Sequence, residues 1–250
     1  TMKPHVMAVL FLLIPFFSIA QIEKAPVCSQ QGWKLVYQSK SDDKVSKYTE
    51  EVVSVNKTPD KWTVKILTRY DNQDKKTALP AIPMTYTMNK SQWMVHNIDF
   101  IKNDIYSIIK SFFPKDIKKD DIKPSDITIT ASADSRDTPY PNTMQKGQKA
   151  KSYPISVDVS IKFISYTIST ATQRYECVGQ ERITVPAGTF DTYVVETDTK
   201  YKASFSLFSK SEVSHERIWL AAGIGTVKKQ TLNKRGKVQS ETVLAYIIKK

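Results

Sequence analysis

The sequence ERITVPAGTFDTYVVE at residues 181–196 joins two β-like runs through a short corner, and this corner decides the fold. Pro186 fixes its own φ and has no amide hydrogen, so it can end a strand but is not accommodated inside one. Gly188 accepts a positive φ, which lets the next strand turn back. Gly223 and Gly225 lie between β-runs rather than before a helix, so they predict a second turn and not a phosphate-binding loop. The corner contains no catalytic motif, and we expect it to be structural.

Alternation of apolar and polar residues with a period of two extends outward from this corner over most of the chain. It is clearest at 62–70 and at 155–163. Further strands are predicted at 33–39, 46–55, 84–88, 92–98, 126–132, 173–185, 190–202, 213–220, 225–232 and 238–248. So many long strands with one polar face predict a mainly β fold, an antiparallel meander that curls into a barrel or half-barrel.

One segment, at residues 103–113, departs from the β pattern. Its apolar residues recur at spacings of three and four, Asn103 can cap the start of a helix, and Pro114 ends it. A short helix of this kind packs across a sheet or closes a barrel end, and an amphipathic contact with a membrane is the alternative. A proline-containing loop is expected at 133–153.

The first twenty residues have the pattern of a secretory signal peptide. A basic start at Lys3 precedes an apolar run at 6–17, and small residues follow up to Ala20. The run is shorter than a membrane-spanning helix needs. We therefore expect residues 1–20 to be removed on export, which leaves residues 21–250 as a single β domain.

The chain is basic, with 37 Lys and Arg against 25 Asp and Glu and a formal charge of +12. Residues 1–20 contain Lys3 and no acidic residue, so 36 basic and 25 acidic residues remain after their removal, a charge of +11. This balance fits nucleic acid, anionic lipid or acidic glycans as partners. Export argues against nucleic acid, and the scatter of the lysines through strands and loops indicates a solvated surface.

Cys28 and Cys177 are the two cysteines of the chain. An exported protein lies in a compartment where a disulfide persists, and a bridge between these two would close a long loop. Two unpaired thiols are the alternative, one at the start of the fold and one on a strand. Neither cysteine has another Cys or a His at ligand spacing, so no zinc site is expected.

The search for catalytic chemistry finds no motif. Neither His96 nor His215 belongs to an H-E-x-x-H pattern, and G-x-S-x-G is missing. Glu196 and Asp198 share one strand face by parity, but it is the face opposite Tyr193, which indicates exposure to solvent. We expect a protein that is not an enzyme and that has no cofactor and no metal.

The four tryptophans all lie on predicted strands. They are Trp33, Trp62, Trp93 and Trp219. Aromatic residues in these positions can provide an apolar or aromatic lining, either of a cavity for an apolar ligand or as one face of a glycan site, while packing in the core is their more ordinary role.

Four stretches follow one another in the order known from a protein family. They are Cys28 with 32–37, Tyr140-Pro141 with 146–149, 178–190, and 218–227. Together they resemble the TapB-like proteins, which are related to a large group of uncharacterised exported bacterial β domains. Thr192 stands where that family commonly has a cysteine, and Ala150 where it usually has leucine. The resemblance implies an exported, mostly antiparallel β protein without an established activity.

These observations favour a non-enzymatic binding or assembly module of the bacterial cell envelope, in the periplasm or associated with the outer membrane. Its expected partner is another envelope protein, and peripheral contact with the membrane is compatible with its charge. The alternative is a barrel-type carrier of a lipid or other apolar ligand. An unfilled apolar cavity would favour the carrier, and a filled barrel with exposed aromatic residues would favour the binding module.

Overall fold

The structure is a computed structural model, and it describes eight ranges of the chain. They are 22–41, 44–71, 81–96, 127–131, 138–151, 155–161, 164–205 and 208–250. The predicted signal peptide at 1–20 and the predicted helix at 103–113 lie outside the described residues. Within these ranges, no helix has the length and apolar character needed to cross a membrane.

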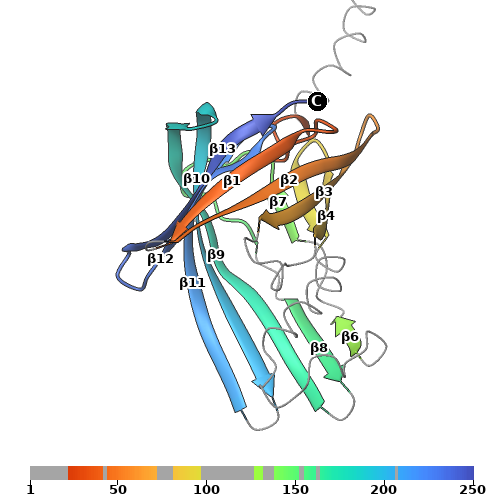
Figure 1. Ribbon diagram of the computed structural model, residues 1–250, viewed down its shortest axis with the longest axis vertical. Helices are drawn as coiled ribbons and strands as arrows, with labels where there is room; N and C mark the ends of the chain where they lie inside the picture. The colour runs from red at the N-terminus through yellow and green to blue at the C-terminus, as the bar shows by residue number, and fades with distance from the viewer. Residues whose placement is uncertain are drawn as a thin grey trace, which may run out of the picture.

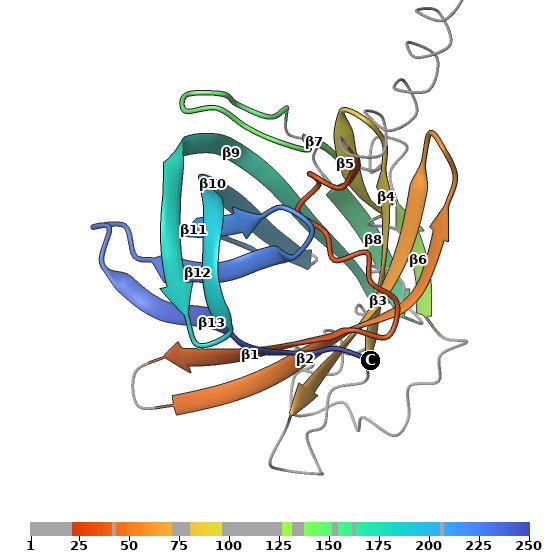
Figure 2. The same ribbon diagram turned by 90° about the horizontal axis from the view of Figure 1, so that it is seen from above.

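The described residues form thirteen β-strands in one sheet, and neighbouring strands pair antiparallel. The strands are β1 Lys34–Ser41, β2 Lys44–Lys57, β3 Trp62–Asp71, β4 Ile82–Met88, β5 Gln92–His96, β6 Ile127–Ala131, β7 Thr138–Pro141, β8 Ile155–Ile161, β9 Ile164–Val185, β10 Gly188–Phe205, β11 Phe208–Ala221, β12 Gly225–Leu232 and β13 Val238–Ile248. Their order across the sheet is β6-β8-β9-β10-β11-β12-β13-β1-β2-β3-β4-β5-β7. The sheet curls into a half-barrel (Figure 1, Figure 2), which confirms the predicted fold class.

Strand β7 lies where the sequence predicts a loop. It pairs with β5, and the order of the sheet ends with it. Pro139 and Pro141 lack amide hydrogens, which makes them unsuitable for a central strand but compatible with an edge strand. The prolines thus mark a sheet edge, although they make the segment look like a loop in the sequence.

The chain that follows β7 connects this edge to β9. The Gly147 amide donates a hydrogen bond to the Cys177 carbonyl over 2.7 Å, and the Cys177 amide donates to the Gln148 carbonyl over 2.9 Å. The Ala150 amide adds a bond to the Tyr175 carbonyl over 3.0 Å. These bonds bring the two arms of the curled sheet together along part of its length.

The corner at 181–196 is the predicted hairpin. β9 and β10 pair from Val185 and Gly188 onward along nearly their whole length, and Gly188 has a φ of +139°. Strands β8 to β11, with β6 beside β8, form an extension at one end of the molecule (Figure 1). The Ala187 amide donates to the Leu244 carbonyl over 3.2 Å, so the tip of the hairpin is tied to β13.

The main core contains the start of the described chain. Ile22 and Cys28 are at most 1% exposed and belong to the core cluster that the sheet surrounds. The segment 22–28 is held against the turn between β11 and β12, where the Gly223 amide donates to the Ala25 carbonyl over 2.9 Å. Gly225 has a φ of +107°, and a Cβ there would lie 3.2 Å from the Pro26 carbonyl oxygen. The predicted second turn is therefore a seat for the N-terminal segment.

The tryptophans belong to the main core. Trp62, Trp93 and Trp219 are buried in it, and Trp33 is partly buried against it. Their burial corresponds to packing in the core, the more ordinary of the two roles considered for them from the sequence.

The predicted disulfide between Cys28 and Cys177 is not formed, and both residues are buried free thiols. Cys28 lies in the main core, whereas Cys177 lies in a second cluster with Met144, Tyr193 and Leu220. The two thiols are thus packed into different parts of the interior. Burial raises the pKa of each thiol, which keeps both in the neutral and less reactive form.

Candidate functional site

The inner face of the half-barrel carries an acidic residue among tyrosines. Tyr37 on β1 lies opposite Tyr48 on β2, and Tyr48 lies opposite Tyr70 on β3. Glu50 is two residues from Tyr48 and two from Val52 of the core, so it shares the same face. We call this group, together with the residues that reach it from other strands, the Glu50 site. Its members are Tyr37, Tyr48, Glu50, Tyr70, Tyr86, Glu216 and Lys229.

Ring contacts between the tyrosines extend from the core to the surface. The rings of Tyr37 and Tyr48 are stacked with centroids 4.7 Å apart, and those of Tyr48 and Tyr70 are 5.5 Å apart. Tyr37 is 1% exposed, whereas Tyr70 is 41% exposed. A second aromatic series begins at Tyr86, whose ring lies 6.3 Å from that of Trp93. The site is thus continuous with the core at one end and accessible at the other.

Glu50 is half-buried in this aromatic surrounding. Burial raises the pKa of its carboxyl group to about 7, while a hydrogen bond from Tyr37 and the positive charge of Lys229 act in the opposite direction. Near neutral pH, Glu50 is therefore present in both its protonated and its ionised form. A carboxyl group in this condition is a common mark of a functional site.

The facing part of the site comes from the C-terminal strands. Lys229 on β12 places its ammonium nitrogen 3.5 Å from a carboxylate oxygen of Glu216 on β11. Both side chains are partly buried. The positive charge of Lys229 also lowers the pKa of Glu50. The same ammonium group thus forms a salt bridge with Glu216 and acts electrostatically on Glu50.

The tyrosine hydroxyls stay neutral at physiological pH. Burial raises the pKa of Tyr37, Tyr48 and Tyr86, and in each the charge of Glu50 raises it further. Each hydroxyl therefore remains able to donate and to accept a hydrogen bond. Together the site offers hydrogen-bonding hydroxyls, aromatic faces and a local excess of carboxyl groups.

Glu50 is not among the site residues predicted from the sequence, although its strand is predicted at 46–55. The available signal is the alternation Tyr48, Glu50, Val52, which puts an acidic residue on an otherwise apolar face. Glu216 and Lys229 are more than 160 positions away along the chain, and only the curl of the sheet brings them to this face.

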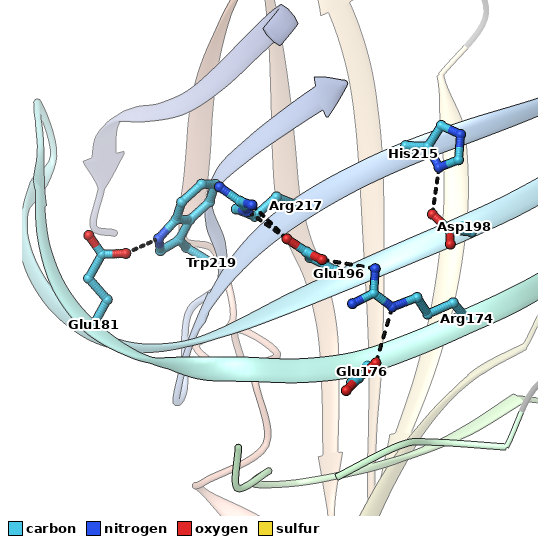
Figure 3. Close-up of polar contacts among 8 residues, drawn as sticks. All are labelled: Arg174, Glu176, Glu181, Glu196, Asp198, His215, Arg217 and Trp219. Atoms are coloured by element: carbon cyan, nitrogen blue, oxygen red, sulfur yellow. Dashed lines mark hydrogen bonds and ion pairs between the residues drawn. The ribbon is translucent and has the colours of Figure 1, made fainter. Parts of the chain in front are cut away.

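A different set of charged residues lies in a row across β9, β10 and β11 (Figure 3). Glu196 accepts from Arg217 over 2.6 Å and pairs with Arg174 over 2.9 Å, and Arg174 also contacts Glu176 over 3.1 Å. Beside them, Asp198 and His215 are 2.6 Å apart. Since these carboxylates and cations are paired with one another, the row holds three neighbouring strands together.

This row changes one prediction from the sequence, namely the solvent exposure of Glu196 and Asp198. Glu196 and Asp198 do share a face, opposite Tyr193, as parity predicts. Their side chains are 19% and 27% exposed, which is less than the predicted solvent exposure. Arginine and histidine side chains from the neighbouring strands cover them. His215 is itself half-buried, and Glu216 beside it points to the other face, toward Lys229.

A pocket of about 430 Å³ opens between the N-terminal segment and strands β9 to β11. Met144, Tyr193 and Leu220 give it an apolar base, and Lys24 and Arg182 are among the residues at its polar side. Its charged lining residues are Lys24, Glu181, Arg182 and Asp191, and the exposed Arg182 and Asp191 pair with each other over 3.8 Å. In the described ranges, no group of three or more His, Cys, Asp or Glu side chains is placed to hold a metal ion.

The comparisons with known proteins agree with this architecture. The DUF3108-like family matches residues 30–244. Two solved structures are similar: a "putative exported protein with YmcC-like fold" from Bacteroides fragilis and a "putative lipoprotein" from Parabacteroides distasonis. Each is 17% identical with a TM-score of 0.61, and the similarity covers 89% and 90% of this chain and 98% of each of theirs. No curated protein matches the sequence. At this identity the structures establish a shared fold, and the TapB-like name stays a prediction.

Proposed function

This chain belongs to the DUF3108-like family, and we propose that it is a non-enzymatic binding protein of the bacterial cell envelope whose ligand contacts the Glu50 site. The observation that carries the proposal is the half-buried carboxyl group of Glu50 on the inner face of an open half-barrel. Burying an ionisable group opposes folding, so such a group contributes nothing to the stability of a core. Beside it, contacts between tyrosine rings extend from buried Tyr37 to exposed Tyr70. Such an arrangement supports ligand binding at this face.

Location in the envelope is supported by the signal-peptide pattern and by the descriptions of the two similar structures as exported protein and lipoprotein. The partner is proposed to be another envelope component, either a protein or a lipid that presents a polar group. Periplasmic and outer-membrane-associated positions are both compatible with these observations.

An enclosed carrier of an apolar ligand has less support. The core next to the Glu50 site is filled by the chain's own side chains, among them Val64 and Met88, which are at most 2% exposed. The accessible part of the inner face is polar and aromatic instead. These features favour a ligand held at an open surface.

Native mass spectrometry tests the proposal. The protein, purified from its native envelope, is measured before and after organic extraction, and Tyr70→Ala is compared with Tyr246→Ala. Tyr246 is the matched control because its exposed fraction of 48% is close to the 41% of Tyr70. Its neighbour Ile247 packs against the core, so Tyr246 lies on the opposite face of β13. We expect a stoichiometric adduct in the wild type and in Tyr246→Ala that is lost in Tyr70→Ala. An adduct retained by all three proteins, or absent from the wild type, would contradict the proposal.

A further inference from the structure

We propose that the Glu50 site recognises an organic ammonium group, a primary or quaternary amine, held between its carboxyl groups and its tyrosine rings. This inference rests on the proposed function and specifies the chemistry of the ligand. Lys229 already places an ammonium group at this site, 3.5 Å from Glu216. The carboxylate of Glu216 therefore already stabilises one ammonium group at this site.

The balance of charge favours a second cation. When both carboxyl groups are ionised, Glu50 and Glu216 carry two negative charges against the single positive charge of Lys229. A bound ammonium group would neutralise the remaining charge, and the partial burial of the site would strengthen that attraction relative to bulk water. A neutral or anionic ligand would leave the remaining negative charge uncompensated.

The tyrosine faces add to this preference, because aromatic rings attract cations through their negative faces. The protein uses the same contact elsewhere: Lys57 lies 4.1 Å above the ring of Trp62, and Lys228 lies 5.0 Å from that of Trp219. In the Glu50 site, the rings of Tyr48 and Tyr70 are tilted by 40° to each other, and exposed Tyr70 offers the accessible aromatic surface.

Binding of an ammonium group is coupled to the proton on Glu50. The titratable or charged groups around Glu50 come from its own strand and from several other parts of the chain. They are Tyr48 of β2, Cys28, Tyr37 of β1, Tyr86 of β4 and Lys229 of β12, and farther from Glu50 are Glu216 of β11 and Tyr70 of β3. Burial raises the pKa values of Tyr37, Tyr48, Tyr86 and Cys28, so these groups stay neutral, whereas the pKa of Glu50 lies at about 7. A cation binds the ionised form and displaces the proton.

Titration calorimetry with ethanolamine and with choline chloride tests the inference. The affinity should fall about tenfold between pH 8 and pH 6, because the ionised fraction of a group with a pKa of about 7 falls by that factor. Glu50→Gln should weaken binding at pH 8 by at least roughly tenfold and remove the pH dependence. Glu51→Gln is the matched control, since Glu51 lies on the opposite face of the same strand and pairs with Lys34 over 3.5 Å. It should retain wild-type affinity.

Vesicles distinguish the two sources of the ammonium group. If the ligand is a lipid headgroup, the affinity of the protein for phosphatidylethanolamine vesicles is higher than its affinity for free ethanolamine. Glu50→Gln then abolishes this difference in affinity. If it is a soluble amine, vesicles add nothing. Absence of amine binding, or equal affinity of Glu50→Gln and Glu51→Gln, would overturn the inference. In that case an adduct that still depends on Tyr70 would preserve the proposed binding function, and loss of both results would reject the two together.

Discussion

Replacing Glu50 by glutamine should stabilise the protein above neutral pH. Burial raises the pKa of Glu50 from 4.5 to about 7 in the folded state. One pKa unit corresponds to about 1.4 kcal/mol, so the ionised carboxylate destabilises the folded state by about 3 kcal/mol at pH 8. Glutamine has a similar shape and carries no charge, and its carbonyl oxygen can still accept the hydrogen bond from Tyr37.

The pH dependence has a defined direction. Between pH 4.5 and pH 7 the folded protein binds more protons at Glu50 than the unfolded chain does, so this residue lowers stability as pH rises through that window. Below pH 4.5 the residue is protonated in both states and makes no contribution. Above pH 7 it is ionised in both states, and its destabilising effect is complete.

Urea unfolding of the wild type, Glu50→Gln and Glu51→Gln at pH 5 and at pH 8 measures this effect. We expect Glu50→Gln to exceed the wild type by about 3 kcal/mol at pH 8, which is roughly 6–12 °C in Tm for a domain of this size, with a much smaller gain at pH 5. Glu51→Gln should follow the wild type at both values. If Glu50→Gln is no more stable than the wild type at pH 8, the carboxyl group is not destabilised by burial and the reasoning is refuted.

Three further results are expected. Ile22→Ala should lower the free energy of unfolding by about 2–5 kcal/mol in urea titrations, because Ile22 is fully buried in the main core; a loss below about 1 kcal/mol would show that the N-terminal segment does not support the fold. Gly225→Ala should cost about 1–3 kcal/mol in the same assay, since a φ of +107° is strained for alanine and its Cβ would lie only 3.2 Å from the Pro26 carbonyl oxygen. Cys28 and Cys177 should react with a thiol reagent in the unfolded protein and remain protected in the folded one; a mass that increases by two hydrogens on reduction would instead reveal a disulfide.

Local sequence patterns predict the parts of this fold that depend on neighbours in the chain. The period of two locates most strands, and Pro186 with Gly188 locates the long hairpin. These features are visible because each depends on the conformation of a few adjacent residues. Strand β7 is missed for the same reason, since the local preference of its prolines for a loop hides a pairing with β5 that only the sheet defines.

The candidate site is hidden from the sequence because it depends on curvature. Tyr48 and Glu50 can be assigned to one face by parity, but Glu216 and Lys229 approach them only when the two arms of the sheet face each other. The missing disulfide has a related cause. A chain with two cysteines and a predicted export signal is compatible with one disulfide. In the fold, however, Cys28 and Cys177 are packed into different clusters.

The seating of residues 22–28 against the turn at 222–224 bears on the order in which the protein can fold. This segment is among the first to be synthesised and its partner among the last, and the same is true of β1 and β13, which pair from Lys34 with Ile248 to Ser41 with Ser240. Contacts between such distant parts of a chain form slowly. During synthesis, β1 therefore lacks one neighbour and the main core stays incomplete until the C-terminal strands have been made. A chain that stops before β13 would expose this unpaired strand edge, and we expect it to be recognised and degraded as unfolded protein.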